Sequence, residues 1–115
     1  GEAAYARIVR IIERDHAGLK EEIAAVKDGS MSVKDMKGFA KYRRNRFEPQ
    51  AVEALSHIVS TATDHELRSI AADAMGWYEY SSVKAEVLAE CQKLYEAEQN
   101  EEIKNILLKS INRLK

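Results

Sequence analysis

The sequence predicts an all-α protein, built as a short right-handed α–α superhelix of about six antiparallel helices. Three observations lead to this prediction. Apolar residues recur at intervals of three and four along most of the 115-residue chain, which is the spacing of one helix face. Five Gly and one Pro are too few for an all-β fold rich in tight turns. Two segments in the C-terminal half repeat their pattern at one offset, which is typical of stacked helical hairpins.

Residues 2–27 are predicted to form one long amphipathic helix. The polar sequence of residues 28–30, with Gly29 at its centre, is expected to end it. His16 takes the place of an apolar residue in the stripe between Ile12 and Leu19. The apolar face is made by Tyr5, Ile8, Val9, Ile12, Leu19, Ile23 and Val26.

A second helix is predicted after Ser32, which suits an N-cap and has Asp35 at the capping-box position. Pro49 ends this helix and fits the first turn of a third. Residues 58–63 are rich in β-branched side chains, so a strand is the local alternative. A strand there would have no partner in the sequence, which favours the helix.

Three further helices complete the predicted array. Thr63 and Glu66 are expected to form a capping box for the fourth, and Asn100 is expected to cap the sixth. Gly76 and the residues after it lead through a turn into the fifth. The fourth helix has the most regular apolar stripe of the chain: Leu67, Ile70, Ala71, Ala74, Met75 and Tyr78.

The repeat has an offset of 36 residues. It places residues 64–70 over 100–106 and the third predicted helix over the fifth. Residues 64–76 resemble the HEAT repeat family, with a polar cap, an aliphatic residue followed by Arg68, an Ala-rich stretch, and an aliphatic residue before Gly76. The resemblance covers about residues 50–115 and is poor over residues 1–47. The tetratricopeptide pattern is not met, because Trp77 follows Gly76 in the wrong order.

We therefore expect a single helical-repeat domain over residues 1–115. An N-terminal helix (1–28) precedes a first hairpin (32–62) and a second hairpin (63–98), and a terminal helix (100–115) closes the array. The HEAT resemblance implies an armadillo-like scaffold that binds a protein partner and has no catalytic residues of its own. It also implies that the second helices of the hairpins line the inner surface.

The composition and the spacing of a few residue types argue against several functions. The formal net charge of −1 predicts no overall attraction to nucleic acid. No apolar run approaches the about 18 residues of a membrane span. His16, His57 and His65 lack metal-ligand spacing, and Cys91 falls in an apolar stripe. No catalytic residue, metal or cofactor is therefore expected.

A basic stripe in the second predicted helix is the first candidate binding site. Its four cations share one helix face at spacings of three, four and three: Lys34, Lys37, Lys41 and Arg44. The stripe is interpreted either as a solvated helix face or as a dock for phosphates or an acidic partner. Residues 79–102 have the opposite bias, with seven Glu, so the chain is dipolar and weak head-to-tail self-association is expected.

Trp77 and Tyr80 form the second candidate site. They either anchor a partner or pack across the turn between helices.

The leading hypothesis is a protein-interaction scaffold. The alternatives are nucleic-acid binding through the basic stripe and an accessory domain of a larger enzyme. Gly1 without a preceding Met suggests a trimmed start. The single unpaired Cys91 favours the cytoplasm, with the periplasm or secretion as the alternative if a leader was removed.

Overall fold

The computed structural model describes residues 1–46 and 48–115, and within the helices it leaves out the side chains of residues 12, 15, 16 and 43–46. The predicted roles of Ile12, His16 and Arg44 therefore lie outside the described residues. Every secondary-structure element in the described part of the chain is a helix, so the all-α prediction is confirmed. The elements are α1 (Glu2–Asp28), α2 (Val33–Arg46), the 3₁₀ turn η1 (Pro49–Ala51), α3 (Val52–Thr61), α4 (His65–Met75), the 3₁₀ turn η2 (Gly76–Tyr80), α5 (Lys84–Ala97) and α6 (Glu101–Leu114).

The helix ends follow local chemistry. Gly29 ends α1 with a left-handed backbone (φ 81°), a conformation open to glycine because it has no Cβ. The Asp35 N–H donates to Ser32 Oγ at 3.1 Å, and the Ile103 N–H donates to Asn100 Oδ1 at 3.0 Å, so both predicted caps are confirmed. The predicted cap of α4 is wrong by one residue. Asp64, with an extended backbone, accepts the Leu67 N–H at 2.8 Å.

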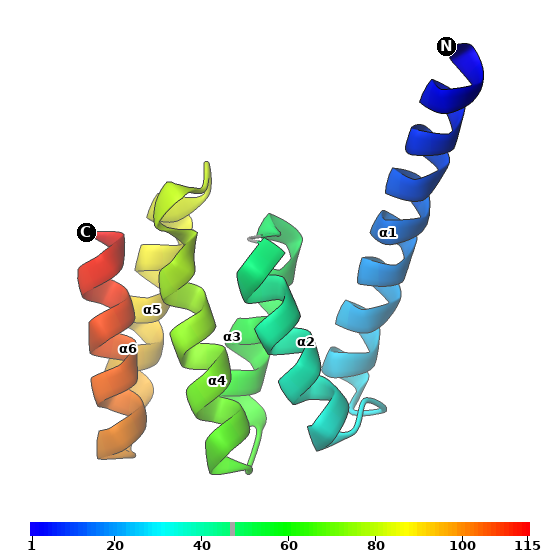
Figure 1. The fold of residues 1–115 in the computed structure, drawn as a ribbon. Coiled ribbons are helices and arrows are strands. Elements are labelled where there is room, and N and C mark those ends of the chain that lie inside the picture. Colours follow the sequence, from blue (N-terminus) through cyan, green and yellow to red (C-terminus); the bar gives the residue numbers. More distant parts are fainter. Residues whose placement is uncertain (47) are drawn as a thin grey trace.

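The helices form two layers (Figure 1). One layer contains α1, α3 and α5, and the other contains α2, α4 and α6, with each helix packed on the next member of its own layer. α3 also contacts α4, and α5 contacts α6, across the space between the layers. The apolar stripes read from the sequence meet there, and Leu55, Leu67 and Leu107 are fully buried. The molecule is flat and elongated, 53 × 32 × 16 Å.

The packing groups the helices differently from the predicted hairpins 32–62 and 63–98. α4 contacts α3 much more extensively than it contacts α5. The reason lies in the connections. Residues 62–64 and 98–100 are three-residue links that force antiparallel neighbours, whereas η2 separates α4 from α5. The hairpins are α3–α4 and α5–α6, and these two units are related by the 36-residue offset.

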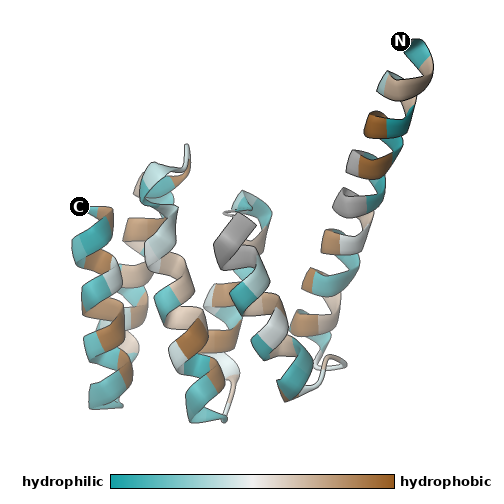
Figure 2. Ribbon diagram, viewed as in Figure 1, coloured by the Kyte–Doolittle hydropathy of each residue, from teal (hydrophilic) through white to brown (hydrophobic). Residues whose placement is uncertain are grey.

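Among the described side chains of α1, the buried ones lie in its C-terminal half. Leu19 and Val26 are each 3% exposed, where α1 packs on α3. The N-terminal half runs past the ends of α2 and α3 (Figure 1). Its hydrophobic residues are visible there along the free part of the helix (Figure 2). The first three turns of the helix leave the large apolar side chains of Tyr5, Ile8 and Ile11 exposed.

Candidate functional site

A groove of about 420 Å³ lies between α3 and α5 on one face of their layer. Apolar side chains and carboxylates alternate around it. α3 and η1 supply one wall, and α5 with the residue before it supplies the other. The lining residues are Pro49, Val52, Glu53, Ser56, Val83, Glu86, Val87 and Glu90.

The local sequence explains the shape of this groove. Residues four apart share a helix face, so Val52 and Ser56 line one wall, and Val83 and Val87 line the other. These side chains are short and leave open space that Leu or Phe would fill. Glu90 completes the α5 wall, and its Oε1 accepts a hydrogen bond from Ser56 Oγ at 2.6 Å, which links the two helices.

The groove is electrostatically negative. Glu53 pairs with Lys27 of α1 (Nζ to Oε1, 2.6 Å), and this hydrogen bond holds the pKa of Glu53 below its usual value. Glu90 is bonded only to the neutral Ser56, and Glu86 has no cationic partner within the described residues. Three carboxylates therefore surround an apolar floor with one ammonium group at the edge. Such a surface fits a segment that carries apolar and cationic side chains together.

The sequence interpretation missed this site, although part of its pattern was visible. The Glu-rich bias of residues 79–102 was noted, but α3 and α5 are separated by α4 in the chain, so their juxtaposition needed the fold. The i, i+4 spacing of Glu86 and Glu90 was the one local clue.

The basic stripe of α2 is partly neutralised. Lys37 Nζ lies 3.2 Å from Glu66 Oε2 and 3.6 Å from Asp64 Oδ1, both at the start of α4. The hydrogen bond to Glu66 is the main reason that the pKa of Lys37 is raised. Lys34 and Lys41 are exposed, and the Arg44 side chain lies outside the described residues. The two carboxylates at the centre of the stripe weaken its attraction for a polyanion.

Trp77 packs against α6. Arg113 lies over the Trp77 ring, with Cζ 4.3 Å from the ring centroid, and the Trp77 Nε1–H donates to Asp73 Oδ2 at 3.3 Å. Arg113 also pairs with Asp73 at 3.6 Å. Tyr80, by contrast, is 94% exposed at the end of η2. The two aromatic residues therefore have different surroundings, and Trp77 stabilises the contact between α4 and α6.

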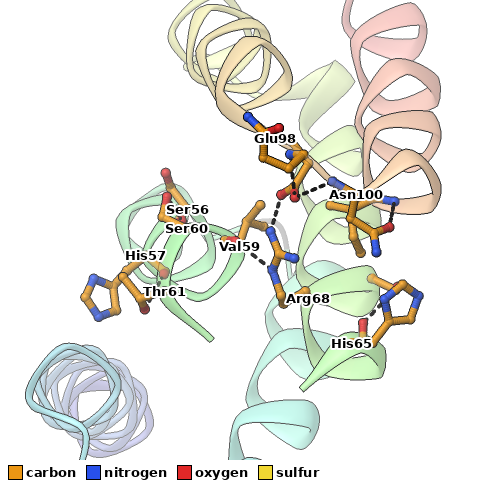
Figure 3. A network of polar contacts seen from close by, with 12 residues as sticks. Ser56, His57, Val59, Ser60, Thr61, His65, Arg68, Glu98 and Asn100 are labelled. Atoms are coloured by element: carbon orange, nitrogen blue, oxygen red, sulfur yellow. Dashed lines mark hydrogen bonds and ion pairs between the residues drawn. The ribbon is translucent and has the colours of Figure 1, made fainter. Parts of the chain in front are cut away.

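A polar network joins the ends of α3, α4 and α5 (Figure 3). Arg68 Nε donates to the Val59 carbonyl at 3.0 Å, and its guanidinium pairs with Glu98, whose side chain is only 8% exposed. Glu98 also accepts the N–H groups of Gln99 and Asn100 at 3.1 Å each. Arg68 thus joins the α3–α4 hairpin to the link between α5 and α6.

Cys91 is part of the hydrophobic core. Its side chain is fully buried, and burial raises the pKa of its thiol to about 12. In the part of the chain that the structure describes, no cluster of three His, Cys, Asp or Glu side chains has a metal-binding arrangement. None of the described helices combines the length and apolarity of a membrane span.

Comparisons with protein-family models, with curated proteins and with solved structures found no match for this chain. The groove between α3 and α5 is therefore interpreted from its own geometry.

Proposed function

We propose that this chain is a non-catalytic, HEAT-like scaffold that binds a protein partner through the groove between α3 and α5. In this proposal the two helix layers form a short right-handed α–α superhelix, and the partner is a helical segment with Lys or Arg beside apolar residues. The single observation that carries the proposal is the apolar groove edged by Glu53, Glu86 and Glu90.

The dimensions of the groove suit such a segment. Its α3 wall runs from Pro49 to Ser56, about 10 Å along the helix axis or two helical turns. Val52 and Val83 are half-buried and would lose their remaining contact with water when covered. A cation of the partner could pair with Glu86, because this carboxylate has no cationic partner within the described residues. Apolar burial would supply affinity, and the carboxylates would supply selectivity for cationic segments.

Nucleic-acid binding through α2 has less support. Asp64 and Glu66 compete with phosphate for Lys37, and the formal net charge of −1 opposes binding of a polyanion.

The test uses a helical peptide of about 14 residues with Leu on one face and Lys along both edges, and a Glu–Leu peptide of the same length as control. Fluorescence anisotropy of the labelled peptide measures Kd. We expect the Lys–Leu peptide to bind and the Glu–Leu peptide to bind at least about tenfold more weakly.

Two variants of α5 locate the binding site. Glu86→Lys places a cation in the groove and should weaken the Lys–Leu peptide about tenfold, whereas Glu96→Lys makes the same change outside the lining and should leave Kd within about twofold. Equal binding of the two peptides, or equal Kd values for the two variants, would overturn the proposal.

A further inference from the structure

We propose that the groove between α3 and α5 is filled by the N-terminal half of α1 from a second copy of this chain, which produces head-to-tail self-association. The inference rests on the proposed function and names the partner of the same groove. Two surfaces of one chain carry it: an unpartnered apolar helix and an apolar groove of opposite charge.

The first surface is the free half of α1. Tyr5 is 70% exposed, Ile8 55% and Ile11 41%, on the same helix whose Leu19 and Val26 are buried against α3 and its neighbours. Large apolar side chains grouped in this way are typical of a contact surface. A helix that is amphipathic over its whole length but covered over only half of it has room for a second partner.

The cations of α1 are placed to meet the carboxylates of the groove. Arg7 and Arg14 are seven residues apart, which puts both on one edge of the apolar stripe, beside Ile11. Both are exposed, and neither has an ion pair within the described residues. The groove offers Glu86 and Glu90 at the edge of its apolar floor. The segment from Arg7 to Arg14 spans about 10 Å, which matches the length of the groove.

The contact has to form between two molecules. α1 is one continuous helix from Glu2 to Asp28, and Lys27 near its C-terminal end pairs with Glu53 at the edge of the groove. The N-terminal half runs away from that point and cannot fold back without breaking the helix. After one contact forms, one copy keeps a free groove and the other keeps a free α1. The interface is therefore heterologous, and it predicts open oligomers that grow with concentration.

Two double variants test this arrangement by sedimentation velocity. The tail variant combines Arg7→Glu with Arg14→Glu, and the groove variant combines Glu86→Arg with Glu90→Arg. We expect the wild type to associate as its concentration rises to about 0.5 mM, and each variant alone to remain monomeric. An equimolar mixture should associate again, because every contact between unlike copies pairs opposite charges.

Lys20→Glu is the matched control. It makes the same kind of charge reversal at an exposed position of the same helix, but beyond Arg14 in the half of α1 that packs on its own molecule, so association should be unchanged. Far-UV circular dichroism checks that each variant is folded. If a variant fails to fold, salt provides the second measurement: raising NaCl from about 50 mM to about 500 mM should weaken wild-type association several-fold.

The outcomes separate the two proposals. Self-association of the groove variant alone would mean that α1 pairs with itself, and would overturn the head-to-tail arrangement. A wild type that stays monomeric but binds the Lys–Leu peptide would overturn this inference and leave the proposed function standing. A wild type that neither associates nor binds the peptide would overturn both.

Discussion

Replacing Gly76 by Ala tests how tightly the two hairpins pack. Gly76 lies where α4 ends and η2 begins, against Ser110 of α6. A Cβ at this position would stand 2.7 Å from Ser110 Oγ and 2.8 Å from Ser110 Cα. Ser110 is 1% exposed, and its hydroxyl donates to the Ala72 carbonyl at 2.7 Å, which holds α6 against α4. The methyl group therefore meets backbone that can move only if the helices separate.

Overpacking of this kind typically lowers the free energy of unfolding by about 1–3 kcal/mol. For a domain of this size that corresponds to a fall in Tm of about 4 °C per kcal/mol. Gly38→Ala is the control, because Gly38 lies inside α2 with nothing within 4 Å of the added Cβ. This change should raise stability by about 0.5–1 kcal/mol, since glycine is a poor helix former.

Urea and thermal unfolding followed by circular dichroism would compare the two variants. Adding Ser110→Gly to Gly76→Ala removes the side-chain contacts but keeps the contact with Cα, so it should restore little stability. The reasoning is refuted if Gly76→Ala is as stable as the wild type.

Four further results are expected. Leu67→Asp should abolish cooperative unfolding, because Leu67 is fully buried and an unpaired buried charge costs several kcal/mol; a melt like that of the parent would show that α4 is not central. Cys91 should react with a thiol reagent in denaturant and hardly at all in the native protein, since its pKa is raised to about 12; rapid native labelling would contradict its burial. The backbone hydrogen bond from Leu67 lowers the pKa of Asp64, so its contribution to stability is full above the ordinary value of 3.8 and is lost as the pH falls through the lower folded pKa. Asp64→Asn should therefore flatten the acid side of the stability curve, and an unchanged acid midpoint would refute this role. Duplex DNA at low salt should show no gel shift, whereas a shift that is lost in Lys34→Glu would restore α2 as a phosphate site.

Much of the helical framework was predictable because its causes are local. Gly29 and Asn100 mark helix ends through the backbone conformation or side-chain acceptor that each supplies within a few residues. The 36-residue offset related the third helix to the fifth and the fourth to the sixth, so it superimposes the packed hairpin α3–α4 on the packed hairpin α5–α6. The predicted hairpins 32–62 and 63–98 paired different helices. The apolar pattern does not show which neighbours pack together, whereas the three-residue links 62–64 and 98–100 decide it. Gly76 also stood out in the sequence, but its reason, Ser110, is 34 residues away.

The candidate site was less predictable, because the charge of a side chain does not show which residues of other helices lie beside it. The basic stripe was read as four cations on one helix face, yet the fold places Asp64 and Glu66 beside Lys37. Trp77 was predicted either to anchor a partner or to pack across the turn, and in the structure Arg113 of α6 lies over its ring. In both cases the residue that makes the contact comes from another helix, and it is too far away in the sequence for a local pattern to predict the contact.

By itself, the sequence determined that the chain is helical, where most helices begin and end, and which apolar residues enter the core. These properties depend on periodicity and on caps within one turn. Only the tertiary structure decided that α3 and α5 stand side by side with short side chains between them, which opens an acidic groove. It also decided that α3 and its neighbours cover half of the α1 stripe and leave Tyr5 and Ile8 in solvent. Burial and electrostatic pairing are properties of juxtaposed helices, and they arise only when segments distant in the chain are packed together.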